Sequence, residues 1–281
     1  MPDVYADIAA ADRNTLENLA RILELRAADP QQGAMRMSYQ SEIELGPGTV
    51  LLEVGCGTGP VSRALAQLRT DCRVVGVDPS PFFLTTARRL AEGIANLQFR
   101  KGDAGHLPFD PGTFDVLVFH TTLCHVPALD EALAEAHRVL RPGGQMVIFD
   151  ADYSTTSVAI SKADPLQACA AATVEAIVHD PYLVQKLAAS IQRAGFTVRI
   201  VRSYGYHGVT DASYMLTIVD RGADVLAGAG RIGSDLAAAL KNEARRRVEA
   251  GTFFGHLAYA SVVAVRSSQL ENHALQPHCS S

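Results

Sequence analysis

Residues 50–59 read VLLEVGCGTG, an apolar segment that runs directly into three closely spaced glycines. A second apolar run, over residues 74–77, ends at Asp78. Glycine has no Cβ, so its backbone adopts tight turn conformations and approaches a ligand closely. A strand, a glycine loop, a helical pattern and an acidic residue after the next strand are the local anatomy of a nucleoside-cofactor site. The stretch therefore predicts an α/β fold with a parallel sheet and a nucleoside-containing ligand.

The helical pattern after the loop starts at about Pro60, and its first N–H groups have no partner within the helix. These groups and the helix dipole favour an anionic ligand group, and either a pyrophosphate or a carboxylate suits them. Asp78 follows Gly59 by nineteen residues. A carboxylate at that spacing accepts hydrogen bonds from both hydroxyls of a ribose, which predicts an unphosphorylated ribose.

Pro60 stands where a dinucleotide-binding loop would have its third glycine, and Glu53 lies two residues before the first glycine. Further motifs follow in order, namely GDA at 102–104, FDVLV at 114–118 and LRPGG at 140–144. With these motifs, residues 36–152 resemble the class I S-adenosylmethionine-dependent methyltransferases, and most of all the broad group that includes the ubiquinone- and menaquinone-pathway enzymes. The resemblance implies that S-adenosylmethionine is the cofactor.

The resemblance also implies roles for single residues. Glu53, Gly55, Gly57 and Gly59 would surround the methionine part, with Glu53 near its ammonium group. Asp78 would bind the ribose and Pro79 would line the adenine edge. The adenine amino group and ring would be bound by Asp103 and by the Ala104 N–H. His120 would form the wall beside the methionine part, and two residues before the first strand would close over the cofactor and reach its carboxylate, Arg36 and Tyr39.

Apolar periodicity predicts the remaining elements. Strands are expected near 49–54, 73–78, 97–101, 114–120, 144–150 and 196–201, with a last strand within 252–265. Helices are expected near 12–29, 34–44, 60–69, 80–93, 130–140, 163–179 and 181–194, with a helical block at 212–250. The fold class is thus a Rossmann-like, seven-stranded, mostly parallel sheet with helices on both faces. The resemblance places the last strand antiparallel between the fifth and sixth.

Four segments follow from this pattern. Residues 1–48 are expected to form helices that cover the cofactor site, and residues 49–152 the S-adenosylmethionine-binding core. Residues 153–266 are expected to add a helical cap and the remaining strands of the same domain, because the connections are longer than a sheet requires. An alternative is that the extra helices only enlarge the helical layer. Residues 267–281 are expected to be a flexible tail.

Composition excludes several classes of function. The net charge of −5 gives no attraction toward nucleic acid, and the only basic cluster lies in an amphipathic pattern at 245–247. No run of about 18 apolar residues exists, and the first residues lack a signal-peptide pattern. The five cysteines are scattered, so we expect reduced thiols in a soluble, cytoplasmic protein that does not bind membranes. The sequence does not decide the oligomeric state, and a homodimer is the assembly that we consider.

Methyl transfer to a hydroxyl or a protonated amine needs a general base. The strongest candidates are His125 and then His207; His120 and Asp152 also lie near strand ends, with Tyr153, Tyr204 and Tyr206 as orienting groups. A structural role competes for each histidine. No metal site is expected, because the spacing of His120 and His125 does not put them on one helical face and no third ligand is indicated.

The predicted function is transfer of a methyl group to a hydroxyl of an apolar or aromatic small molecule. N- or C-methylation, or use of the cofactor in a cyclisation without methyl transfer, are the alternatives. A nicotinamide-dependent oxidoreductase is disfavoured by Pro60. The aromatic residues after residue 150 would suit an apolar pocket or an ordinary core equally well, namely Tyr153, Tyr182, Tyr204, Tyr206, Tyr214, Phe253 and Phe254.

Overall fold

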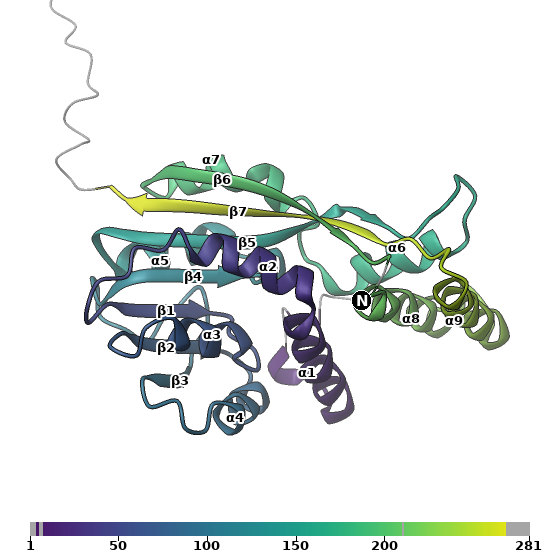
Figure 1. Ribbon diagram of the computed structural model, residues 1–281, viewed down its shortest axis with the longest axis horizontal. Coiled ribbons are helices and arrows are strands. Elements are labelled where there is room, and N and C mark those ends of the chain that lie inside the picture. The colour runs from purple at the N-terminus through teal and green to yellow at the C-terminus, as the bar shows by residue number, and fades with distance from the viewer. Residues whose placement is uncertain (1–3, 6–7, 210, 268–281) are drawn as a thin grey trace, which may run out of the picture.

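The computed structural model describes residues 4–5, 8–209 and 211–267 (Figure 1). Seven strands form one sheet in the order β3-β2-β1-β4-β5-β7-β6. Their bounds are Val50–Val54 (β1), Arg73–Asp78 (β2), Leu97–Lys101 (β3), Phe114–His120 (β4), Leu140–Ser157 (β5), Phe196–His207 (β6) and His256–Arg266 (β7). Strands β1 to β5 pair in parallel, and β7 runs antiparallel between β5 and β6. The predicted fold class and the place of the last strand are confirmed.

The helices of the described residues cover both faces of the sheet. They are Arg13–Ala28 (α1), Pro30–Gln40 (α2), Pro60–Leu68 (α3), Pro81–Leu90 (α4), Leu129–Val139 (α5), Leu166–Ile177 (α6), Leu183–Arg193 (α7), Ser213–Gly228 (α8) and Ser234–Glu249 (α9), with short 3-10 turns at Ile8–Ala10 (η1) and Leu123–His125 (η2). Helices α2 and α3 lie over one face, and α5 and α7 lie together over the other (Figure 1). Because both faces are covered, the central strands are almost wholly apolar.

Several boundaries differ from the sequence-based expectation. Helix α2 begins at Pro30 rather than near residue 34, because the Asp29 carboxylate accepts hydrogen bonds from the Gln31 and Gln32 amides and caps the helix. Strands β5 and β6 extend well beyond 144–150 and 196–201. Both extensions pair with β7, so tertiary pairing supplies what the local pattern did not indicate. Apart from Ser267, the tail predicted at 267–281 lies outside the described residues.

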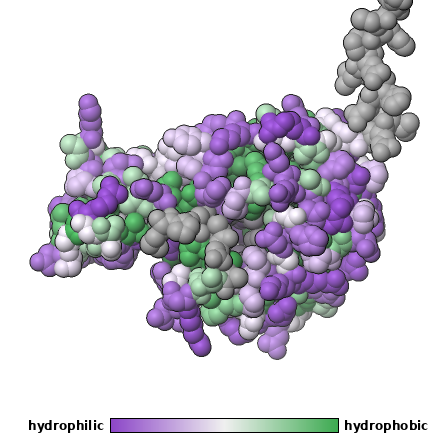
Figure 2. Space-filling view, turned by 180° about the vertical axis from the view of Figure 1, so that it is seen from behind, coloured by the Kyte–Doolittle hydropathy of each residue, from purple (hydrophilic) through white to green (hydrophobic). Residues whose placement is uncertain are grey.

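The long strands carry a cap made of α6, α8 and α9, which lies to the right in Figure 1. Figure 2 shows this cap as a lobe that projects from the main body. Helices α6 and α8 pack so closely that a Cβ on Gly222 would lie 1.8 Å from the Cys169 carbonyl oxygen. The extra helices thus pack mainly on one another, and α6 also contacts β5.

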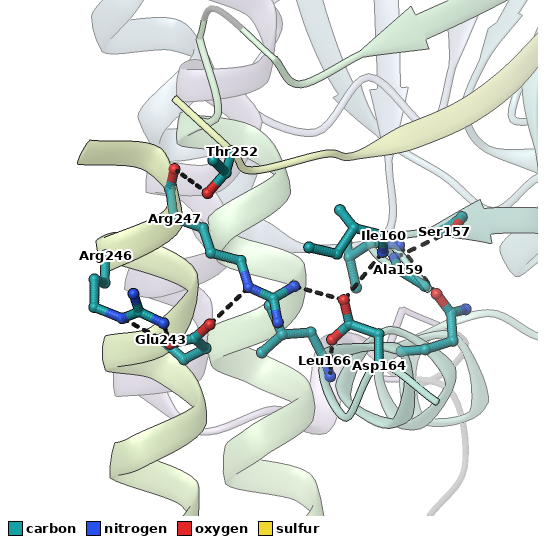
Figure 3. Close-up of polar contacts among 11 residues, drawn as sticks. Ser157, Ala159, Ile160, Asp164, Leu166, Glu243, Arg246, Arg247 and Thr252 are labelled. Carbon is teal, nitrogen blue, oxygen red and sulfur yellow. Dashed lines mark hydrogen bonds and ion pairs between the residues drawn. The ribbon is translucent and has the colours of Figure 1, made fainter. Parts of the chain in front are cut away.

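An ion pair fastens α9 to the segment that enters α6 (Figure 3). Arg247 donates to the Asp164 carboxylate at 2.5 Å, and the Asp164 side chain is only 1 % exposed. The same carboxylate accepts from the Ile160 and Leu166 amides. This buried charge is thus both paired and hydrogen-bonded, as a stable interior requires.

In the described part of the chain, no helix combines the length and the apolar character needed to cross a membrane. Four cysteines fall in that part, Cys56, Cys72, Cys124 and Cys169, and all are buried free thiols.

Candidate functional site

The glycine loop joins β1 to α3, and its three glycines all have positive φ values. A Cβ on Gly55 would lie 2.3 Å from the Thr122 side chain, and one on Gly59 would lie 2.7 Å from the ring of Phe99. Only glycine satisfies both the dihedral angles and the close approach. The loop therefore packs against Thr122, which follows β4, and against Phe99 of β3.

The amides of this loop are largely bonded within the protein. The Gly55 and Cys56 N–H groups donate to the Val77 carbonyl at 2.8 and 2.9 Å. Gly57 donates to the Asp78 carboxylate at 2.8 Å, and the Ser62 backbone N–H bonds to Glu53. The sequence pattern indicated that N–H groups at this helix start would face an anionic ligand. In the structure, carboxylates of the chain itself accept from two of the N–H groups in this region, those of Gly57 and Ser62.

Asp78 stands at the end of β2 and is 6 % exposed. Besides the Gly57 amide, its carboxylate accepts from the Ser80 amide at 2.8 Å. Burial nevertheless raises the pKa of Asp78 to about 6. The group lines the cavity together with Pro79, and its remaining lone pairs are available to hydroxyl donors.

Glu53 lies deeper, on β1, with 2 % of the residue exposed. Its carboxylate accepts a short hydrogen bond from the Ser62 hydroxyl. Burial raises the pKa of Glu53 to about 8, although this hydrogen bond and Arg63 act in the opposite direction. A carboxyl group in this condition is stabilised in its charged form by a cation in the cavity.

The cavity has a volume of about 480 Å³, within the range of small-molecule sites. It lies at the carboxyl ends of the strands, where ligands bind in open α/β sheets. The structure brings together nine of the predicted residues in its lining: Glu53, Gly55, Gly57, Asp78, Pro79, Asp103, Ala104, His120 and His125. Gly59 is not among the lining residues; it shapes the loop as the residue before α3.

His120 ends β4 and forms part of the cavity wall. Its Nδ1 atom lies 2.9 Å from the Tyr39 hydroxyl, and its ring stacks on Phe149 at 4.8 Å. Burial, together with the nearby Arg26 and Arg36 guanidinium groups, holds the pKa of His120 well below its usual range. The ring is therefore neutral at physiological pH and fixed in orientation.

Tyr39 and Arg36 were predicted to close over the cofactor. Tyr39 is fully buried behind His120 and does not line the cavity. Arg36 lines a small side cavity of about 20 Å³, which it shares with Arg26 and His120. The Arg36 Nε atom is buried without a hydrogen-bond partner, so this guanidinium has a donor left for a ligand carboxylate.

Arg26 lines the cavity, and sequence reasoning missed it. It lies near the end of α1 and donates to the Thr121 hydroxyl at 2.7 Å. Thr121 is a non-glycine residue with a positive φ of 50°, a conformation that surrounding contacts must hold. The Thr121 hydroxyl also donates to the His120 carbonyl at 2.7 Å. Local sequence gives no signal for this contact, since 95 residues separate its partners.

His125 lies in the η2 turn and lines the cavity beside Tyr5, whose ring centroid is 4.5 Å from its own. Asp150, a second residue that sequence reasoning missed, is fully buried in the middle of β5. Burial raises the pKa of Asp150, while the Cys124 side chain and His125 act to lower it. The Asp150 carboxyl therefore lies within electrostatic reach of His125.

His207 is not brought to the cavity. Its backbone bonds to the Gln31 side chain, and its ring lies 4.9 Å from that of His256. Asp152 accepts from Gln185 of α7, Tyr204 lies beside Ser38 and Ser261, and Tyr206 donates to Asp29. Of the aromatic residues expected in a pocket, the cavities near the site include only Tyr153 and Tyr214.

Over the residues the structure describes, no group of three His, Cys, Asp or Glu side chains is placed to hold a metal ion. The site is thus a hollow with two raised-pKa carboxyls on the glycine-loop side, Glu53 and Asp78, and a neutral His120. Arg26 and His125 line both this hollow and a smaller cavity beside α6 and α8.

Residues 52–148 match the family model described as a methyltransferase domain. The demethylmenaquinone methyltransferase of Staphylococcus epidermidis is 33 % identical over 126 residues, which cover 44 % of this chain and 52 % of that protein. The chain spans about half the length of the first curated relatives it matches.

Two solved structures show the same fold. A Bacillus halodurans protein, titled as a methyltransferase, superposes with a TM-score of 0.60 at 19 % identity, covering 83 % of this chain and 99 % of its own. A (4+2)-cyclase superposes with a TM-score of 0.56 at 22 % identity, covering 84 % and 82 % of the two chains.

Proposed function

We propose, from the premise that residues 52–148 form a class I methyltransferase domain, that this protein transfers a methyl group from S-adenosylmethionine to a small molecule. The observation that carries the proposal is the pair of buried carboxyls in one cavity, Glu53 and Asp78. Both have raised pKa values, so both are stabilised in charged form by a cationic or hydroxyl-rich ligand. S-adenosylmethionine has an ammonium group, a sulfonium and a ribose.

The residues fit this cofactor in detail. Glu53 would bind its ammonium group and Asp78 its ribose hydroxyls, with Pro79, Asp103 and Ala104 at the adenine end. Arg36 would bind its carboxylate with the donor that now lacks a partner. When bound, S-adenosylmethionine supplies a methyl group on a positively charged sulfur.

The chain's own contribution to the reaction is alignment and proton removal. The neutral His120, fixed by Tyr39 and Phe149, forms a rigid wall beside the reacting groups. A rigid wall keeps the acceptor in line, and alignment supplies much of the acceleration in a displacement of this kind. His125 accepts the acceptor's proton, and the buried Asp150 stabilises the imidazolium that results.

A base at this place supports a hydroxyl acceptor, so O-methylation is the reaction we propose. N- and C-methylation use the same cofactor site and remain the alternatives. Cyclisation without methyl transfer is a second candidate, supported only by the fold shared with the (4+2)-cyclase.

Calorimetric titration with S-adenosylmethionine, S-adenosylhomocysteine and NAD tests the proposal. We expect binding of the first two and none of NAD, together with formation of S-adenosylhomocysteine when a suitable acceptor is added. Binding of NAD alone, or of none of the three, would overturn the proposed cofactor. Binding of S-adenosylmethionine with product formed from the substrate but no S-adenosylhomocysteine would favour cyclisation.

A further inference from the structure

A narrow compartment, here called the neck, leads from the cofactor cavity toward the cap. Its volume is about 40 Å³, and it lies among α1, α6, α8 and Tyr153 of β5. It shares Leu23, Arg26 and His125 with the cofactor cavity. On its other side it shares Ile22, Thr217 and Arg221 with an open groove of about 930 Å³ between α1 and the cap. The neck therefore lies between the cofactor cavity and the groove and shares wall residues with each.

The walls of the neck combine apolar side chains with several polar ones, among them the guanidinium groups of Arg26 and Arg221. The Thr173 and Thr217 hydroxyls each donate to a backbone carbonyl at 2.6 Å. An apolar compartment with a few polar groups left over is the usual form of a small-molecule site, and the remaining groups decide what it binds.

Arg221 is the charged wall residue that distinguishes the neck from the cofactor cavity. No hydrogen bond or ion pair joins it to another residue within the described ranges. The acids beside it on α8 point to α9, where Asp220 binds Arg245 and Asp224 binds Lys241. Across the groove, Glu175 of α6 pairs with Arg231. The nearby carboxylates thus have other partners, and the Arg221 guanidinium lines the neck with its charge uncompensated.

We propose that Arg221 binds a carboxylate of the methyl acceptor, which enters from the groove and places its reacting group beside His125. The inference rests on the proposed function and names the class of its substrate: an apolar, phenol-like acid. A guanidinium presents two parallel N–H groups that match a carboxylate. A carboxylate also carries a single negative charge, which matches the charge of one guanidinium.

Arg221 does not line the cofactor cavity. Its substitution therefore separates binding of the acceptor from binding of the cofactor. Among the described residues, Arg221 has no hydrogen-bond or ion-pair partner that its removal would leave unpaired, so we expect Arg221→Gln to fold as the wild type does.

The test measures binding to the full-length protein in the presence of saturating S-adenosylhomocysteine. The probes are para-hydroxybenzoate, para-hydroxyphenylacetate and para-hydroxycinnamate, the three matching carboxamides, and phenyl phosphate. We expect at least one acid to bind about ten- to a hundredfold more tightly than its amide, because a charge-assisted hydrogen bond is lost in the amide. Arg221→Gln should abolish this preference without changing the affinity for S-adenosylhomocysteine, and Arg221→Lys should restore part of it.

Arg231→Gln is the matched control, since it removes the same charge from the groove but not from the neck. We expect the wild-type preference for acids in this variant. The proposal is overturned if the acids bind no better than their amides, if phenyl phosphate binds better than every acid, or if Arg221→Gln keeps the preference. Failure of S-adenosylhomocysteine itself to bind would instead overturn the proposed function.

Discussion

Asp78 uses its carboxylate inside the protein as well as toward the cavity. It accepts from the Gly57 and Ser80 amides, both at 2.8 Å, and so fixes the glycine loop to the end of β2. Sequence reasoning alone predicts that Asp78→Ala weakens cofactor binding and leaves the fold intact. The two internal hydrogen bonds indicate that any substitution here also affects stability.

We expect Asp78→Asn to weaken S-adenosylhomocysteine binding by about ten- to a hundredfold, because the ribose loses a charged acceptor. The free energy of unfolding should fall by about 1–3 kcal/mol, since one loop amide then faces the side-chain NH₂ group. Titration calorimetry and urea unfolding measure the two effects. Unchanged affinity would refute the ribose assignment even if stability falls.

Glu53 makes the stability of the ligand-free protein depend on pH. Its pKa rises from 4.5 to about 8 on folding, so the folded state retains a proton that the unfolded state releases. Its contribution to stability therefore decreases as pH rises from about 4.5 to about 8, by about 5 kcal/mol at most. Glu53→Gln removes this term, so its urea-unfolding free energy should be flatter over that range than that of the wild type. Parallel curves for the two proteins would contradict the assignment.

At the scale of elements, the site is closed by a helix that local sequence does not connect with it. Helix α1 is bound to the glycine-loop region through Glu24, which accepts from the Thr58 hydroxyl at 2.6 Å and from Arg63 at 2.7 Å. The same helix brings Arg26 to Thr121. Of the α-helices in residues 1–48 that were predicted to cover the site, α1 is the one whose residues reach the cavity. Helix α2 contacts His120 through Tyr39, which does not line the cavity.

The cap likewise contains a contact between residues that are far apart in the sequence, the ion pair of Arg247 and Asp164. Arg247→Met leaves the buried Asp164 without its cation, and we expect a loss of about 3–5 kcal/mol in the free energy of unfolding. Arg246→Met is the control on the same helix, because Arg246 is 70 % exposed and pairs only with Glu243; its effect should be below about 1 kcal/mol. Chemical denaturation measures both variants. Equal losses would show that the Arg247–Asp164 pair does not anchor the cap.

At the level of the whole molecule, the cofactor cavity lies between the N-terminal helix and the sheet core, and the neck beside it extends this region to the cap. A ligand in that cavity binds the folded state alone and stabilises all three parts together. At a hundred times its dissociation constant, S-adenosylhomocysteine should add about 2.7 kcal/mol to stability. This corresponds to a rise in Tm of about 5–8 °C. NAD at the same concentration is the control, and an equal rise with NAD would contradict a selective site.

The βαβ unit that holds the glycine loop follows from local sequence patterns alone. The apolar run of β1, the glycines after it and Asp78 act within one βαβ unit, where geometry follows from residue type: glycine alone takes the positive φ values, and alternating strands and helices make a parallel sheet. For this reason the parallel sheet and the glycine loop were predictable from a single chain, while the resemblance to methyltransferases supplied the place of the last strand and most of the cavity-lining residues.

The contacts around the cavity between side chains that are far apart in the sequence follow instead from how the helices and strands pack. Arg26 and Thr121, or Arg221 and the neck, are joined by helix packing, and nothing in the local pattern records such contacts. For the same reason His207, near a strand end like His125, pairs with His256 instead of reaching the cavity. Hydrophobic periodicity gives an element and its buried face, but the place where two such faces meet depends on all the elements packed around them.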